Sequence, residues 1–186
     1  MQARFLADVL RNRHNAQILE RWASLHLKDG WLVAGCLFQT VWNVLSGQAP
    51  EGQIKDYDFF YFDAQDLSAT GERAVQAHVE GTLADLGITV EVVNQARVHC
   101  WYEAHFGHPC APLNSAKDGI DRFLMPATCV GINVHEVYAP HGLGLLYEGT
   151  LTMNPLTPHE PLFAKKAASY QRRWPWLRIV GSPGVA

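Results

Sequence analysis

The chain has 186 residues, which is enough for one domain with a sizeable core. Its composition, 48% hydrophobic and 18% charged, is that of an ordinary soluble globular protein, and its apolar runs are too short to cross a membrane. A formal net charge of −3 argues against a protein that coats long nucleic acid, because such a protein needs a basic face.

The N-terminal segment has no uninterrupted apolar stretch, since charged residues such as Asp8 and Arg11 appear early. It therefore does not resemble a signal peptide, and we expect a cytoplasmic protein. Apolar residues at three- and four-residue spacing predict helices over residues 4–11 and 16–27. The four cysteines form no C-x-x-C motif, so we expect free thiols.

The middle of the chain alternates strand patterns with helix patterns. We expect strands over residues 31–34, 56–62 and 88–93, a helix over 37–45, and a second helix that begins near Ser68 or Thr70 and ends at Gly87. Nine of the 18 acidic residues lie between Glu51 and Glu91, which suits the binding of a cation.

The C-terminal third has weaker patterns. Ser115 and Asp118 resemble a capping box that opens a short helix through Phe123. Residues 129–137 alternate, with Val130, Ile132 and Val134 on one face, which predicts a half-exposed strand. A last helix runs from Phe163 to Trp174 and ends at Pro175. The whole order predicts an α/β (α+β) fold with a central mixed sheet flanked by helices.

Two carboxylates need an explanation. Asp56 and Asp58 are two residues apart on a strongly β-forming segment, so both side chains point to the same face. Two like charges beside a buried strand are unfavourable unless a cation lies between them, and oxygen ligands suit Mg²⁺. Glu91, alone in a β-branched segment, is a candidate third ligand. The alternative is that these carboxylates contact only water.

Gly35 follows the first predicted strand and precedes a helix. Glycine permits close approach to the backbone, and the first amides of a helix lack partners, so this turn is a candidate anion site.

This order of turn, helix, paired aspartates and later acid resembles the nucleotidyltransferase superfamily typified by DNA polymerase β. The matching positions are Gly35, Asp56, Asp58 and Glu91. More narrowly, the chain resembles a small bacterial family of nucleotidyltransferase-like proteins with no assigned substrate. The stretches that carry this likeness are 33–35 with 41–42, 56–63, 94–99 and 173–176. Two features depart from the superfamily pattern: Cys36 replaces a glycine or serine, and the gap between Gly35 and Asp56 is long.

The resemblance implies one nucleotidyltransferase-like domain over residues 1–186, with helical extensions at both ends. It implies that Asp56, Asp58 and Glu91 are catalytic and bind Mg²⁺ or Mn²⁺, and that a nucleoside triphosphate donates its nucleotide with release of pyrophosphate. Gly35, Cys36, Lys55 and Arg97 are the candidate nucleotide-binding residues, although Lys55 and Arg97 are equally suited to ion pairs with the acidic cluster. Asn94 and Gln95 either contact a base or sugar or shape the turn after their strand.

The acceptor stays open between a sugar phosphate, an antibiotic-like hydroxyl or amine, a protein side chain and a nucleic-acid end, with long nucleic acid least expected. Two other functions compete. The same fold can act as a non-catalytic module that binds nucleotide or a partner. A zinc site is also conceivable in the loop that contains His99, Cys100, His105, His108 and Cys110, although the spacing matches no common pattern.

Overall fold

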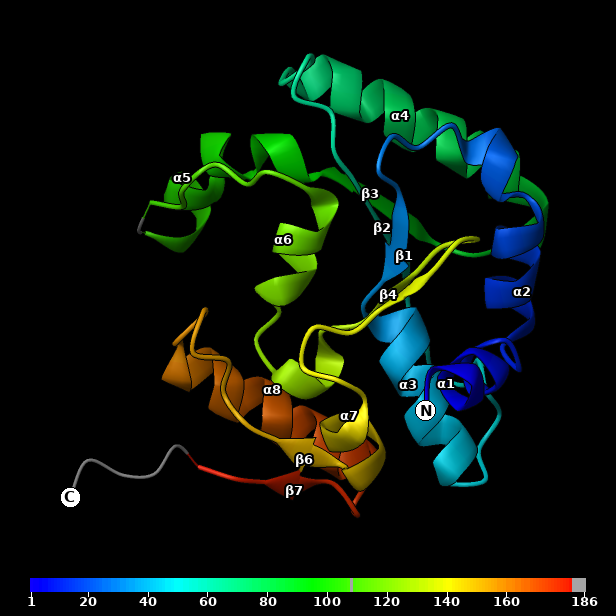
Figure 1. Cartoon of the computed structure of the whole chain (residues 1–186), viewed down its shortest axis with the longest axis vertical. Helices are drawn as coiled ribbons and strands as arrows, with labels where there is room; N and C mark the ends of the chain where they lie inside the picture. Colours follow the sequence, from blue (N-terminus) through cyan, green and yellow to red (C-terminus); the bar gives the residue numbers. More distant parts are fainter. Residues whose placement is uncertain (108, 182–186) are drawn as a thin grey trace.

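β2 (Tyr57–Tyr61) is an inner strand of a five-stranded mixed sheet. The strand order is β3-β2-β1-β4-β5, with β2 and β3 parallel and the other neighbours antiparallel (Figure 1). The computed structural model describes residues 1–107 and 109–181. The other strands are β1 (Trp31–Val33), β3 (Val90–Asn94), β4 (Gly131–Ile132) and β5 (Val137–Tyr138), and a separate parallel pair is formed by β6 (Thr150–Leu151) and β7 (Arg178–Ile179). The predicted mixed sheet flanked by helices is confirmed.

The helices cover both faces of this sheet (Figure 1). They are α1 (Gln2–Val9), α2 (Arg13–Glu20), α3 (Gly35–Leu45), α4 (Ala69–Leu83), α5 (Tyr102–Phe106), α6 (Ala116–Asp121), α7 (Gly144–Glu148) and α8 (Glu160–Arg173), with short 3-10 turns at 22–25, 84–86, 95–100 and 126–128. No helix of the described chain is long and apolar enough to cross a bilayer.

The two faces of β2 differ because successive side chains alternate. Tyr57, Phe59 and Tyr61 are buried in the main core, which also contains side chains of α1, α3 and α4. Phe60, on the other face, packs against a smaller core built from β1 and α6. Asp58 lies on this second face, which is only partly covered.

The predicted helix boundaries follow from their caps. The Ser68 hydroxyl accepts a hydrogen bond from the Gly71 amide at 2.9 Å at the start of α4, and Gly87 ends the following turn with a φ of 64°. Ser115 caps α6 through the Asp118 amide at 3.2 Å. α8 ends at Arg173, two residues before Pro175.

Two expected elements are wrong. Residues 129–137 do not form one strand, because the Asn133 side chain accepts hydrogen bonds from the amides of His135 and Glu136 and closes a tight turn between β4 and β5. Val134 is consequently 49% exposed at that turn. The helix expected over 16–27 stops at Glu20 and continues only as a 3-10 turn.

The C-terminal aromatic residues pack back onto the domain. The Trp174 indole is fully buried and donates to Asn43 Oδ1 at 3.0 Å, while the Trp176 indole donates to Ser46 Oγ at 2.9 Å. These bonds connect the end of α8 with the end of α3 and so bring α8 alongside the helix that follows β1.

Candidate active site

The sheet brings the predicted carboxylates together. Asp58 on β2 and Glu91 on β3 are direct partners in the register of the parallel pair. Asp56 precedes β2 by one residue and therefore points to the same side as Asp58. Asp58 is half-buried and Glu91 is exposed, so the group stands at the edge of a covered region.

Asp58 is the most perturbed member of this group. Burial, followed by the negative charges of Asp56 and Glu91, raises its pKa to about 7. The positive charge of Lys166 and hydrogen bonding to the Gly35 backbone act in the opposite direction. A carboxyl group with these neighbours has less compensation for its negative charge than it would have in water, so a bound cation would stabilise its ionised form.

The predicted glycine turn lies beside this group. Val33, the last residue of β1, is the register partner of Asp58, and α3 begins two residues later at Gly35. Ala34 between them has φ 60° and ψ −135°, a conformation that is strained for a residue with a Cβ. The turn thus directs the N-terminus of α3 toward the carboxylates, where its amides favour an anion.

The Cys36 thiol does not face this opening. It is fully buried, and its Sγ donates to the Val33 carbonyl at 3.2 Å. Burial and the charge of Asp58 raise its pKa well above the usual value. Only the backbone amide of Cys36 is available for a phosphate.

The two predicted basic residues, Lys55 and Arg97, lie in different places. Lys55 is exposed and adjacent to Asp56. Arg97 lies beyond the opposite end of β3, where its guanidinium forms an ion pair with Glu72 and donates to the Leu67 carbonyl at 3.3 Å. The structure therefore does not bring Arg97 to the carboxylates, and its ion pair with the acidic cluster is the arrangement observed.

α8 contributes residues that were not among the predicted site residues. Lys166 and Tyr170 are four residues apart and so share a helix face. Burial raises the pKa of Tyr170, and the charges of Asp58 and Asp56 add to this rise. Arg173 donates to Gln39 Oε1 at 2.6 Å and to the Gly52 carbonyl at 3.2 Å. The helical spacing of Lys166, Tyr170 and Arg173 is visible in the sequence, but it does not reveal what the helix packs against.

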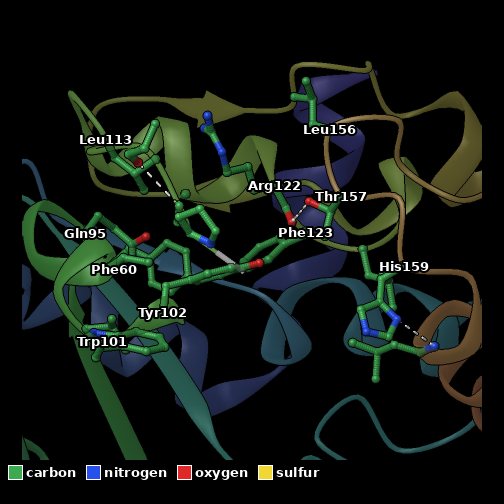
Figure 2. Close-up of a pocket in the computed structure, with 18 of the residues that line it drawn as sticks. Phe60, Gln95, Trp101, Tyr102, Leu113, Arg122, Phe123, Leu156, Thr157 and His159 are labelled. Atoms are coloured by element: carbon green, nitrogen blue, oxygen red, sulfur yellow. Dashed lines mark hydrogen bonds between the residues drawn. The ribbon is translucent and has the colours of Figure 1, made fainter. Parts of the chain in front are cut away.

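A cavity of about 690 Å³ opens on the same sheet face (Figure 2). Phe60 and Val93 form part of its wall, and each lies two residues beyond a carboxylate of the pair Asp58 and Glu91. Gln95, which the sequence offered as a base or sugar contact, also lines this cavity.

The carboxylates fit a hard divalent cation in the chemistry of their oxygen donors and in the uncompensated charge at Asp58. As they stand, no three His, Cys, Asp or Glu side chains of the described residues are gathered closely enough to hold a metal ion. The zinc alternative concerns the loop from His99 to Cys110. His99 and Cys100 are in contact at 3.5 Å, and His108 lies outside the described residues.

Comparison with known proteins identifies a family and a similar fold. A family model described as nucleotidyltransferase matches residues 20–179. The chain is similar to a solved structure described as a CCA-adding enzyme head domain, with a TM-score of 0.72 and 25% sequence identity over 90% of this chain and 89% of the other. No curated protein matches the chain.

Proposed function

We propose, from the premise that the chain belongs to the nucleotidyltransferase family, that it moves a nucleoside monophosphate from a nucleoside triphosphate to an acceptor and releases pyrophosphate. The observation that supports this most directly is the register pairing of Asp58 with Glu91 beside the strained turn at Ala34. A carboxylate group and a helix N-terminus that share one opening are what a triphosphate with its cation needs.

The proposed reaction is a single displacement at the α-phosphorus. A bond forms between the acceptor oxygen and phosphorus, while the bond from phosphorus to the bridging oxygen breaks. Pyrophosphate leaves with the electron pair, and the acceptor proton passes to solvent. In this scheme the amides of Gly35, which also hydrogen-bonds to Asp58, and of Cys36 orient the phosphates, and Lys166 offsets part of the negative charge of the phosphates.

Asp56, Asp58 and Glu91 are the residues that would hold Mg²⁺ or Mn²⁺. When bound, such an ion would neutralise charge on the triphosphate and on the acceptor oxygen. Without a cation the carboxylates would repel the triphosphate, so binding of the two should be interdependent.

Calorimetric titration of each of four nucleoside triphosphates, with and without Mg²⁺, tests the proposal. We expect binding that requires Mg²⁺ in the wild type, is lost in Asp58→Asn and Glu91→Gln, and is retained in Asp63→Asn. Asp63 is a suitable control because it follows the same strand at its other end, where it pairs with Lys28 at 3.1 Å. Equal binding in all four proteins would refute a role for the carboxylates.

A non-catalytic nucleotide-binding module is the second candidate, because the same fold can bind a nucleotide without turnover. It would take up the triphosphate with Mg²⁺ but release no pyrophosphate with any acceptor. The solved structure to which this chain is similar is described as a CCA-adding enzyme head domain, so an RNA 3′ end belongs in the acceptor screen beside small hydroxyl compounds.

A further inference from the structure

The cavity beside the carboxylates has the size and lining of a small-molecule site. Its volume of about 690 Å³ falls within the range of ligand pockets. Aromatic and aliphatic side chains from four separate segments form its walls; they include Phe60, Trp101, Tyr102, Leu113, Phe123 and Leu156 (Figure 2). Flat aromatic walls favour a planar, apolar ring.

The cavity lies on the acceptor side of the proposed reaction. Val33 and Asp58 are opposite each other on the antiparallel strands β1 and β2. Measured along these strands, the turn at Gly35 lies to one side of this pair and Phe60 lies to the other. At about 3.3 Å per residue, Phe60 and Val93 are each roughly 7 Å beyond Asp58 and Glu91. An in-line displacement brings the acceptor in opposite the leaving pyrophosphate, so phosphates at Gly35 require an acceptor on the side of the cavity.

Gln95 supplies a polar side-chain amide to the wall of the cavity. It lines the cavity and is only 3% exposed, yet its side-chain amide makes no hydrogen bond to any described residue. Its oxygen lies over Gly119, where a methyl group would come within 2.1 Å. Neither atom of this amide is among the buried, unpartnered side-chain atoms of the described residues, so the amide is open to the cavity, where a ligand can hydrogen-bond to it.

The charge of the cavity limits its ligand further. Of the described lining residues, none is acidic, and only Arg122 and His159 can carry a positive charge. Arg122 already donates to the Asp118 carbonyl at 3.0 Å. A nucleic-acid strand would need several phosphate contacts, which this lining does not offer.

We propose that this cavity is the acceptor subsite and that it takes a small, uncharged, planar ring compound with a hydroxyl group, held between aromatic side chains and hydrogen-bonded to the Gln95 amide. This inference rests on the proposed function, because the hydroxyl of such a compound would be the group that attacks the α-phosphorus.

Two phenols of this shape, 4-methylumbelliferone and 2-naphthol, serve as probes in fluorescence and calorimetric titrations of the whole chain. We expect saturable binding that Leu156→Trp weakens at least tenfold, because Leu156 is 58% exposed at the cavity and a larger ring there fills the space without disturbing the core. Leu67→Trp, at a 40% exposed leucine away from the cavity, is the matched control and should leave the affinity unchanged.

Gln95→Leu separates a ligand contact from a structural one. We expect it to weaken 4-methylumbelliferone about fivefold, the effect of one hydrogen bond, and to leave the melting temperature unchanged because the Gln95 amide makes no hydrogen bond to another described residue. A lower melting temperature with unchanged probe affinity would overturn the role of Gln95.

Titration of the triphosphate with Mg²⁺ in the presence of each probe distinguishes the two proposals. Simultaneous binding supports an acceptor subsite. Competition between probe and triphosphate would mean that the cavity takes the nucleobase and would overturn the inference. Normal triphosphate binding without saturable probe binding would overturn this inference alone, whereas no Mg²⁺-dependent triphosphate binding in the wild type would overturn the proposed function and the acceptor role with it.

Discussion

Asp58 and Glu91 stand opposite each other on neighbouring parallel strands, with Asp56 on the same side of the sheet. Parallel neighbours keep their side chains in step, so the two carboxylates cannot move apart without a shift in register. Lys166 of α8 is the cation whose charge lowers the pKa of Asp58, and it only partly offsets the burial and the two acidic neighbours. The site therefore maintains a concentration of negative charge that folding alone does not favour.

Replacing Asp58 by Asn should stabilise the protein at high pH. The pKa of Asp58 is raised from 3.8 to about 7, so the folded state holds a proton that the unfolded state has lost across this interval. Stability of the wild type should thus fall as pH rises between these values. Asp58→Asn should melt at the same temperature as the wild type near pH 4 and at a higher temperature at pH 8, and Mg²⁺ should raise the melting temperature of the wild type alone at pH 8.

Asp63→Asn should behave in the opposite way. The Gln65 amide and Lys28 lower the pKa of Asp63, so its contribution to stability is present at neutral pH and disappears as pH falls through the lowered value. This variant should melt below the wild type at pH 7 and converge with it in acid. Parallel pH profiles for the two variants would contradict the assignment of Asp58 as an unfavourably placed carboxylate.

The sequence alone was enough to predict that the carboxylates lie together, because their placement depends on local rules. Alternation along a strand places Asp56 with Asp58, and a glycine turn after a strand predicts the anion site at Gly35. Even the pairing of Glu91 needed only one further assumption, that the strand after the intervening helix lies beside the first. Caps such as Ser68 were predicted for the same reason, since each acts within four residues.

What the sequence did not reveal depends on contacts between distant segments. The helix of Phe163 to Trp174 was expected, but its position against the carboxylates follows from bonds such as that between Trp174 and Asn43, which are 131 residues apart. Arg97 was left open between a phosphate contact and an ion pair with the acidic cluster, because sequence alone does not show that Glu72 is within reach of it. The turn at Asn133 was missed because three alternating apolar residues outweighed one side chain that closes a hairpin.

Replacing Lys166 by Met should weaken triphosphate binding about tenfold, since one cation that faces the phosphates and carboxylates is lost. The pKa of Asp58 should rise further for the same reason. Calorimetry with Mg²⁺ measures the first effect, and a carboxyl titration followed by NMR measures the second. Lys165→Met is the matched control, because Lys165 is also exposed on α8 but one position removed around the helix. Equal losses in both variants would indicate a general charge effect.

Replacing Arg173 by Lys should destabilise the fold by about 1–3 kcal/mol, because an ammonium group does not reproduce the two bonds of the guanidinium. Arg173 connects Gln39 on α3 with the Gly52 carbonyl in the long loop before Asp56, and its guanidinium lies 4.1 Å from the Trp174 ring centroid. Urea denaturation measures the change, with Arg172→Lys, at an exposed position, as the control. If the loop depends on this bond, Arg173→Lys should also reduce triphosphate affinity, whereas Arg172→Lys should change neither quantity.

Asn94 and Gln95 should respond to mutation in opposite ways, although they are neighbours with the same functional group. The Asn94 oxygen accepts from the amides of Asp63 and Ala96 at 3.0 and 3.1 Å, and its nitrogen donates to the carbonyls of Asp63 and Asp66 at 3.0 and 3.1 Å. Asn94 therefore shapes the turn after β3.

Asn94→Ala should lower the free energy of unfolding by roughly 2–4 kcal/mol, because four buried or partly buried backbone groups lose their partner. For a chain of this length that corresponds to a fall of about 5–15 °C in the melting temperature. Gln95→Leu, which removes an amide without partners, should cost little or nothing. Thermal denaturation of the two variants side by side decides the matter. A similar loss in both would mean that Gln95 supports the fold, and the cavity would then lose the polar group that gives its ligand an orientation.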